Sequence, residues 1–370
     1  MKNKSNILYV SNIPAPYTVE FCNQLSEKFN LTVMFERSAA RDRNENWYCD
    51  IKRNYKEIIL EQYAVGEESS IGIKWRKTVK QHKWDMICVD GYSSPSSVLL
   101  VFYCQLKKIP YCVRSDGTFI HKNSCIIEKL KKILLCKSKI CFVSSTQTAQ
   151  YFQMLGVLEK NIFKYPFSSI RKSDIVKITE IEKQNLKHKL HIDSTKLVIS
   201  VGQFIPRKGF DVLIRACKYI SEDVCVLIIG GNVNDEYLKL CNENNVHNIK
   251  FMPFMKKDEL KKYYLASDVF AFPTREDIWG LVINEALAAG LPVVSTNRCM
   301  AALEMVKNGK NGYIVDVENE VQLADKINEI LNDSELRKKM SENSLKMAEK
   351  YTIDETAQVF ADVFNRLMRN

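Results

Sequence analysis

Short apolar runs alternate with longer segments of mixed character along most of the chain. In the first half, the apolar runs predict strands, and the segments between them place apolar residues at helical spacing. The predicted strands are 7–10, 31–35, 58–60, 86–89, 110–113 and 140–143, and the predicted helices are 19–29, 75–82, 97–106, 124–136 and 147–155. Such an alternation predicts a parallel, doubly wound sheet.

The same alternation restarts after residues 168–195, which are polar and lack a strong apolar face. The second set of predicted strands is 197–201, 224–229, 249–252, 269–272 and 293–296, and the predicted helices are 210–220, 235–244, 258–265, 281–289, 321–331, 334–350 and 356–368. We therefore predict an α/β protein with two Rossmann-like domains facing across a cleft, built from residues 1–172 and 196–350 with a connection at 173–195.

The composition supports this prediction and indicates the cellular compartment of the protein. The chain has 370 residues, of which 46% are hydrophobic and 26% charged, as is typical of a soluble protein with two domains. No apolar run approaches the length of a membrane span, and the polar N-terminus has no signal-peptide core. The twelve cysteines contain no C-x-x-C pair and several lie in apolar runs, which predicts reduced, buried thiols in a cytoplasmic protein.

Positive charge is concentrated in the first half of the chain. Residues 1–175 hold 27 Lys and Arg against 16 Asp and Glu, a net charge of +11, whereas the remainder has a net charge of −1. In segment 122–139, lysines alternate with isoleucines and leucines at helical spacing. This pattern first indicates a core-facing stripe, with the lysines either on a solvated face or on a surface attracted to anionic lipid. The segment lacks the aromatic and arginine residues of a nucleic-acid site.

Residues 269–296 predict a strand, a polar loop, a helix and a second strand. Gly280 precedes the helix, whose first N–H groups and dipole suit a phosphate. Asp277 lies just before this helix and Glu285 lies within it, and carboxylates accept hydrogen bonds from hydroxyls. A ligand that is part phosphate and part polyol, such as a nucleotide sugar, fits this pattern.

Other charged residues follow predicted strands. Arg207 and Lys208 lie between a strand and a helix, where they would bind phosphate or remain a solvated pair. The alternatives are a structural salt bridge for Glu285, which has apolar neighbours, and a helix cap for Asp277. Asp116 is a sugar or acceptor contact or an ordinary turn residue. Weaker candidates are Asp90, His121 and Glu304.

Three pieces of the second half resemble the retaining glycosyltransferases of family 4, which have the two-domain GT-B fold. Residues 201–211 are similar to the family's strand, basic loop and helix. Residues 276–286 resemble its E-x7-E motif, with Asp277 and Glu285 in the places of the two acids, and residues 288–294 resemble its usual continuation. Departures are Gln203 where the family often has Arg, no glycine-rich loop after the first strand, and Ser-Asp-Gly near a place where many members have His.

The resemblance implies a role for each matching position. Arg207 and Lys208 would neutralise the donor diphosphate, Glu285 would bond the ribose, and Asp277 with the N–H groups after it would hold the sugar. Together with Asp116, which is predicted from its place after a strand and not from the resemblance, the predicted catalytic residues are Arg207, Lys208, Asp277 and Glu285. The implied donor-binding residues are Gly202, Gln203, Arg207, Lys208, Met252, Pro253, Phe254, Asp277, Trp279, Gly280, Leu281, Val282 and Glu285.

The resemblance also implies a function. We expect transfer of a sugar, with retention, from a UDP- or GDP-linked donor to an acceptor hydroxyl, with no metal or other cofactor. The acceptor would be lipid-linked or an oligosaccharide bound by the first domain, as in bacterial-type surface polysaccharide or glycolipid assembly at the inner face of the cell membrane. A C-terminal helix in 351–370 would cross back to the first domain. The alternatives are a GT-B-fold sugar-nucleotide epimerase and a catalytically silent nucleotide-sugar-binding subunit.

Overall fold

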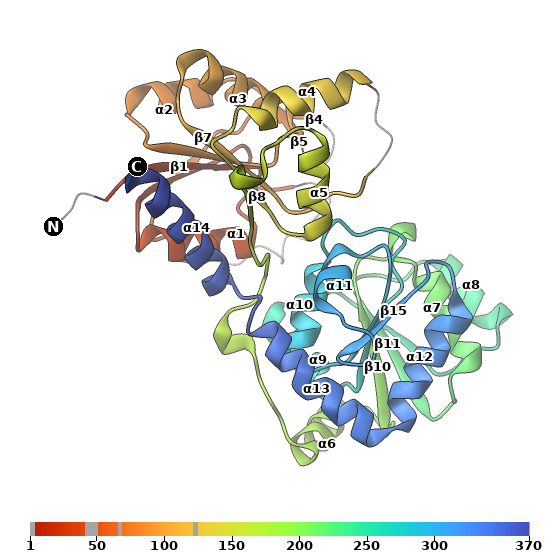
Figure 1. Ribbon diagram of the computed structural model, residues 1–370. Coiled ribbons are helices and arrows are strands. Elements are labelled where there is room, and N and C mark those ends of the chain that lie inside the picture. The colour runs from red at the N-terminus through yellow and green to blue at the C-terminus, as the bar shows by residue number, and fades with distance from the viewer. Residues whose placement is uncertain (1–3, 41–50, 66–68, 121–124, 370) are drawn as a thin grey trace. The chain divides into compact units, whose positions relative to one another are not determined.

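The computed structural model describes residues 4–40, 51–65, 69–120 and 125–369 (Figure 1). Contacts divide the chain into two units, each described here by itself. Unit 1 comprises the chain up to Ser168 together with the C-terminal residues from Ile353, and unit 2 comprises Ser169–Thr352. Residues 173–195, expected to connect two domains, instead belong to unit 2, where helix α6 (Glu180–Lys189) packs against α9 (Lys257–Ala266).

Unit 1 contains a parallel sheet in the order β3-β2-β1-β6-β7-β8-β9. Its strands are β1 (Asn6–Ser11), β2 (Asn30–Phe35), β3 (Lys56–Ile59), β6 (Met86–Asp90), β7 (Tyr111–Ser115), β8 (Ile140–Val143) and β9 (Ile162–Lys164), with a separate antiparallel pair β4 (Tyr63–Val65) and β5 (Ser69–Ile71). Its helices are α1 (Pro16–Ser26), α2 (Trp75–Gln81), α3 (Pro95–Lys107), α4 (Cys125–Cys136), α5 (Thr146–Met154) and α14 (Ile353–Arg369).

The sheet of unit 1 is covered on both faces, because successive residues of a strand point to opposite sides. On β8, Cys141 and Val143 join a core cluster that includes residues of α2, α3, α4 and α5. Phe142, between them, faces the other side and stacks on Phe360 of α14 with ring centroids 3.7 Å apart. Helix α14 is therefore part of unit 1, although it comes last in the sequence.

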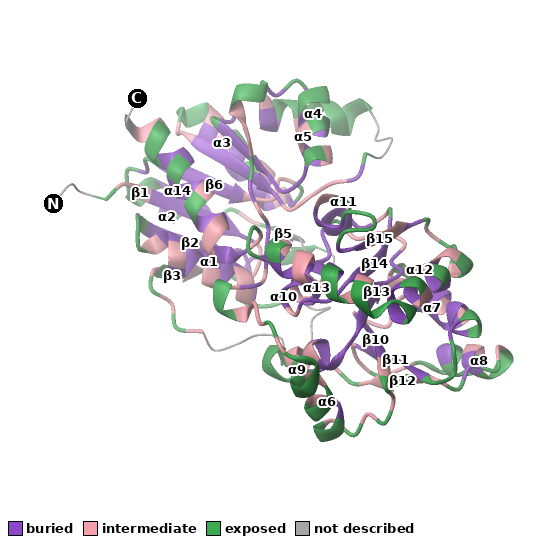
Figure 2. Ribbon diagram, turned by 60° about the horizontal axis from the view of Figure 1, so that its bottom comes forward, coloured by how far each residue is buried: buried purple, intermediate pink, exposed green. Residues whose placement is uncertain are grey.

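Unit 2 contains a second parallel sheet, in the order β12-β11-β10-β13-β14-β15. Its strands are β10 (Lys196–Val201), β11 (Val224–Ile229), β12 (Ile249–Met252), β13 (Val269–Phe272), β14 (Val293–Thr296) and β15 (Gly312–Val315). Its other helices are α7 (Phe210–Ala216), α8 (Asp235–Glu243), α10 (Leu281–Ala288), α11 (Met300–Met305), α12 (Glu320–Asn332) and α13 (Ser334–Ala348). The central strands of both sheets are buried, whereas the edge strands β3, β9 and β12 are partly exposed, and many exposed residues lie on the outer faces of the helices (Figure 2).

The predicted α/β class with two parallel, doubly wound sheets is confirmed. Strands β4, β5, β9 and β15, of three or four residues each, were not predicted. The core-facing stripe predicted for segment 122–139 is wrong for most of α4, where Ile126, Ile127 and Ile133 are exposed. Residues 122–124 of this segment lie outside the described part of the chain. None of the helices among the described residues is long and apolar enough to cross a membrane.

Candidate functional site

In unit 2, the chain runs from β10 to β11 and β12 on one side and then returns to β13 on the other side of β10. Ligands of open α/β sheets bind where the strand order reverses in this way, beyond the carboxyl ends of the strands. The loops after β10 and β13 meet at this point. A Cβ atom on Gly209, which has a φ of +68°, would lie 2.1 Å from the carbonyl oxygen of Pro273. Glycine is therefore required at 209 for the two loops to pack together.

Lys208 and Asp277, one from each loop, form an ion pair at this reversal. The Lys208 ammonium lies 2.5 Å from Asp277 Oδ2, and Arg207 Nη1 lies 3.8 Å from the same oxygen. Arg207 also donates a hydrogen bond to the carbonyl of Glu276. The side chains of Lys208 and Asp277 are only 13% and 14% exposed, whereas that of Arg207 is 48% exposed. The structure thus brings together the basic loop and the first acid of the predicted site.

Helix α10 begins directly after this ion pair. Gly280 precedes it with a φ of +94°, and a Cβ atom there would lie 2.7 Å from Cys299 Sγ and 3.7 Å from Asp277 Cγ. The helix N-terminus, at the partly exposed Leu281 and Val282, is therefore close to the Asp277 carboxylate. Its first N–H groups have no partner within the helix, so they provide the donors of the predicted phosphate site.

The side chain of Trp279, between Asp277 and Gly280, is enclosed. Its indole N–H donates to Asn284 Oδ1 at 2.9 Å, and its ring lies beside Tyr351. The predicted donor contact of this residue is therefore not available to the side chain, which belongs to the core. The short polar loop before Gly280 gave no sign that the ring of Trp279 would be enclosed.

Glu285 lies one turn further along α10, and its carboxylate accepts hydrogen bonds from two hydroxyls. Tyr264 donates to Oε2 and Ser169 donates to Oε1, each at 3.2 Å. Burial raises the pKa of the Glu285 carboxyl above its ordinary value, although the nearby Lys257 acts in the opposite direction. For Glu285, the sequence predicted a ligand contact, with a structural salt bridge as the alternative. Neither of these includes the two hydroxyl partners, which come from α9 and from the start of unit 2.

The remaining predicted donor-binding residues lie at the ends of β10 and β12. Gly202 follows β10 directly, and a Cβ atom on Gly230, after β11, would lie 1.7 Å from the Gly202 carbonyl oxygen. Gln203 comes next in the loop and is partly exposed. The edge strand β12 ends at Met252, and of the three residues 252–254 Pro253 is exposed and the other two are partly exposed. These groups therefore follow three adjacent strands at one edge of the sheet.

Arg275 is a residue of this region that the sequence did not single out. Its guanidinium forms a two-pronged ion pair with Asp211 of α7, at 2.9 and 2.7 Å, and also bonds to Glu318 and to the carbonyl of Pro206. Its backbone N–H donates to the carbonyl of Arg207 at 2.8 Å. These ion pairs lower the pKa of Asp211, against the effect of burial. Arg275 thus fastens the basic loop on both sides of Lys208.

Asp116 lies in unit 1, directly after β7, where a buried arginine holds it. Arg114 Nη2 and the Tyr165 hydroxyl bond to Asp116 Oδ1 at 3.0 and 2.9 Å. Arg114 also contacts Asp90 at 3.0 Å and the Tyr9 hydroxyl at 2.6 Å. Burial alone would lower the pKa of Arg114, but Asp116 and Asp90 outweigh it and the pKa is raised.

The four residues around Asp116 are largely enclosed, whereas Asp116 itself opens to solvent. The Arg114 side chain is 2% exposed and that of Asp116 is 35% exposed. The sequence indicated Asp116 and Asp90 separately, but it gave no signal for Arg114 or the two tyrosines, which are interspersed with ordinary core residues. His121 lies outside the described residues.

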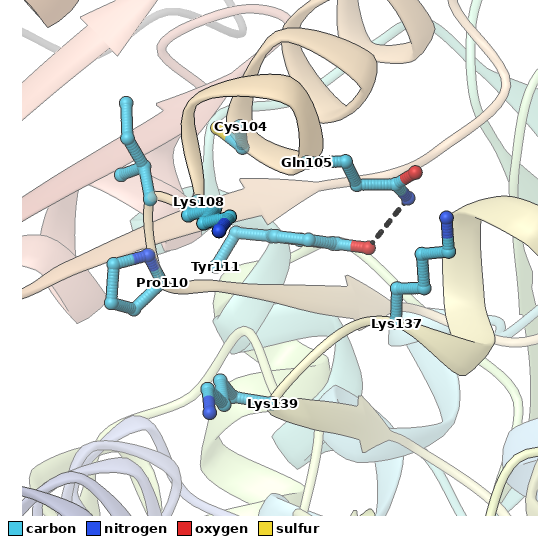
Figure 3. A pocket seen from close by; sticks show the side chains of 8 residues that line it. Cys104, Gln105, Lys108, Pro110, Tyr111, Lys137 and Lys139 are labelled. Carbon is cyan, nitrogen blue, oxygen red and sulfur yellow. Dashed lines mark hydrogen bonds between the residues drawn. The ribbon is translucent and has the colours of Figure 1, made fainter.

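Unit 1 also has a cavity of about 270 Å³ at the amino end of β7 (Figure 3). It is lined by Cys104, Gln105, Lys108, Ile109, Pro110, Tyr111, Lys137 and Lys139. Inside it, Gln105 donates a hydrogen bond to the Tyr111 hydroxyl at 2.9 Å. Arg114 and Asp116 lie at the carboxyl end of the same strand, so the cavity is separate from the predicted acceptor residues.

Comparisons with known proteins identify similar chains. A family model described as "Glycosyl transferases group 1" matches residues 182–347, which lie within unit 2. An uncharacterized glycosyltransferase from Haemophilus influenzae is 26% identical over 291 residues, which cover 77% of each chain. The spore coat protein SA of Bacillus subtilis is 32% identical over 180 residues, which cover 45% of this chain and 48% of that protein.

Solved structures resemble the chain over nearly its full length. A glycosyltransferase from Rickettsia africae has a TM-score of 0.78 at 16% identity, with all of both chains covered. The HepE protein of Anabaena in complex with UDP has a TM-score of 0.80 at 16% identity, covering 98% of this chain and 100% of that one. The same protein was also solved with UDP-glucose. At this identity the likeness concerns the fold, which is the GT-B fold that the sequence predicted.

Proposed function

We propose, from the premise that residues 182–347 belong to the glycosyl transferases group 1 family, that this glycosyltransferase moves a sugar from a nucleotide diphosphate sugar to an acceptor hydroxyl with retention. The observation that carries the proposal is the meeting of Lys208 and Asp277. They are 69 positions apart in the sequence, yet they lie together beside the N-terminus of α10. A cation and a helix N-terminus suit a diphosphate, and an adjacent carboxylate suits the hydroxyls of a sugar.

The difficult step is the departure of the diphosphate from the anomeric carbon. Negative charge then builds on the leaving oxygen, and fixed positive groups aimed at that oxygen typically provide the largest catalytic contribution. We assign this role to Arg207, Lys208 and the first N–H groups of α10, which in this proposal do the work that a metal ion does in other enzymes. The leaving phosphate itself would receive the acceptor proton on the same face of the sugar, so retention needs no carboxylate nucleophile.

Glu285 and the end of β12 complete the donor site in this proposal. The Glu285 carboxylate already accepts hydrogen bonds from hydroxyls, which is the kind of partner that a ribose offers. Residues 252–254 would contact the base. HepE binds UDP and UDP-glucose according to its structures, and this supports a UDP-linked donor over a GDP-linked one.

For the acceptor side, we assign Asp116 as the group that accepts a hydrogen bond from the acceptor hydroxyl. A buried arginine needs one carboxylate to balance its charge. Arg114 has two, and the second, Asp116, is partly exposed at the carboxyl edge of a parallel sheet. Its orientation is fixed by Arg114 and Tyr165.

We further propose that the acceptor is lipid-linked or an oligosaccharide of surface polysaccharide or glycolipid assembly, and that the protein contacts the inner face of the cell membrane through α4. Ile126 is 79% exposed, and Ile127 and Ile133 are also exposed among lysines. Much of helix α4 is coloured as exposed in Figure 2. Apolar residues interleaved with lysines suit the interface of an anionic bilayer.

The membrane contact is tested with vesicles. We expect co-sedimentation with phosphatidylglycerol vesicles but not with phosphatidylcholine vesicles, and we expect it to weaken as salt is raised. The double substitution Ile126→Ser and Ile133→Ser should reduce it about tenfold. Leu158→Ser with Ile181→Ser, at two other exposed apolar positions, is the matched control. Binding that does not depend on lipid charge or salt would contradict this part of the proposal.

The transfer reaction is tested by screening UDP- and GDP-sugars for thermal stabilisation of the purified chain, followed by product analysis with the stabilising donor. A donor at 100 times its dissociation constant should stabilise the fold by about 2.7 kcal/mol. Sugar transferred to an added glycoside or to water supports the proposal. Conversion of the donor into an isomeric sugar nucleotide would instead identify an epimerase, and binding without turnover would identify a silent binding subunit.

A further inference from the structure

The ion pair between Lys208 and Asp277 joins two groups that the proposed function gives to different parts of the donor. Lys208 is assigned to the diphosphate and Asp277 to the sugar. The two groups lie 2.5 Å apart, and both side chains are mostly enclosed. The ammonium that should attract the diphosphate is therefore already neutralised by a carboxylate. A diphosphate that enters must displace Asp277 from Lys208 or share the ammonium with it.

This competition affects UDP and a UDP-sugar differently. When UDP alone binds, the displaced carboxylate loses its nearer cation, keeps only the more distant Arg207, and lies in a partly enclosed place beside an anion that donates no hydrogen bond to it. When a UDP-sugar binds, the sugar hydroxyls can donate hydrogen bonds to the same carboxylate. Hydrogen bonds donated to a carboxylate are strong, so they offset part of the free energy that is lost with the ion pair.

We propose that Asp277 is a specificity-determining residue that selects the intact sugar nucleotide over free UDP by competing for Lys208. This inference rests on the proposed function, because it takes the donor to be a nucleotide diphosphate sugar. In each cycle, the sugar nucleotide exchanges the ion pair for sugar contacts. After transfer, the sugar has left the site, Asp277 returns to Lys208, and the remaining UDP is displaced.

The backbone around Lys208 and Asp277 is held in place, so a ligand would most simply be accommodated by a change of partners at these two side chains. The backbone of the basic loop is held by bonds from Thr274 and Arg275 to the Arg207 carbonyl, and Gly209 packs directly against Pro273. Asp277 is held in the same way, since its N–H donates to the Arg298 carbonyl at 2.8 Å. With both backbones fixed, the choice of partner falls to the Lys208 and Asp277 side chains.

The test is calorimetric titration of the full chain with UDP and with UDP-glucose, comparing the wild type with Asp277→Asn. Asparagine keeps the shape of the side chain and its ability to accept a hydrogen bond, but it removes the competing charge. We expect UDP to bind about twofold to tenfold more tightly to the variant. UDP-glucose should bind no more tightly, so the preference for the sugar nucleotide over UDP should fall.

Glu276→Gln is the matched control, because it removes the same charge one position away, where the carboxylate pairs with Arg298 instead. We expect Glu276→Gln to change the affinity for UDP and the affinity for UDP-glucose only slightly. Both changes should be smaller than the change in UDP affinity caused by Asp277→Asn. The proposal is overturned if UDP binds Asp277→Asn as weakly as the wild type or more weakly, or if the control reproduces the gain. If the wild type prefers GDP, the same comparison is made with GDP and GDP-mannose. A wild type that binds neither nucleotide overturns the proposed function itself.

Discussion

The two units carry charged residues at the same place in the same kind of sheet, but they enclose them differently. In unit 1, Arg114 is on a strand and is almost completely buried between Asp90, Asp116 and two tyrosine hydroxyls. In unit 2, Lys208 is on a loop and pairs with a single carboxylate, that of Asp277, with which it is partly exposed. A buried group with several fixed partners orients its neighbours, whereas a loop residue with one principal partner is able to exchange it for a ligand.

The largest expected effect is on stability and concerns unit 1. Arg114→Met leaves Asp90 and Asp116 without their cation, and breaking a buried ion pair in this way typically costs about 3–5 kcal/mol. Urea unfolding of the variant should show this loss. Tyr165→Phe, which keeps the ring and removes one hydroxyl, should lose much less. A variant Arg114→Met as stable as the wild type would show that the cluster is not the fixed centre described here.

The next largest effect is on catalysis and concerns unit 2. Lys208→Ala should lower the rate of transfer about 100- to 1,000-fold, because the proposed mechanism then loses a positive group aimed at the leaving phosphate. The melting temperature should change little, since the side chain belongs to a loop. Glu285→Ala should likewise abolish transfer. Lys239→Ala, at an exposed lysine of the same unit, is the control, and full activity of Lys208→Ala would refute the donor-site assignment.

A smaller effect is expected from Arg275, which fastens the basic loop of unit 2. Arg275→Met should weaken the binding of UDP about tenfold and the binding of UMP less. The reason is that the basic loop, which the substitution misplaces, would bind mainly the second phosphate. Arg337→Met removes an arginine of similar exposure elsewhere in unit 2 and should leave both affinities unchanged. Equal losses for UDP and UMP would mean that Arg275 supports the fold of the domain rather than the phosphate site.

The smallest effect is a pH dependence that unit 2 derives from its own buried ion pair. Asp268 Oδ2 lies 2.8 Å from the Lys187 ammonium, and burial, which would raise the pKa of Asp268, is outweighed by Lys183 and Lys187, which lower it. The resulting stability is present above the unfolded pKa of about 3.9 and is lost as pH falls through the folded pKa. A pKa that is lower by one in the folded state contributes about 1.4 kcal/mol to the free energy of unfolding. Unfolding of Asp268→Asn should therefore depend less on pH below 4 than that of the wild type.

Much of the fold was predictable, and the candidate donor residues could be named, because both have local signals. Strand and helix periods extend over five to fifteen residues, so the alternation that defines two doubly wound sheets is visible in the sequence. The donor candidates Lys208, Asp277 and Glu285 are also visible, since each stands in a short motif of strand, loop and helix. Trp279 shows the limit of such motifs. Its place beside Asp277 suggested a ligand contact, but packing against Tyr351 puts the ring in the core.

The sequence by itself determined the fold class, the order of the elements and the kinds of chemical group available to a donor. Only the tertiary structure decided which groups meet: Lys208 with Asp277, Arg275 with Asp211, and Arg114 with partners from Tyr9 to Tyr165. The physical reason is that periodicity and turn chemistry act within a few residues. Contacts between distant segments depend instead on the strand order of the sheet and on which side chains the core encloses, and no local pattern encodes either.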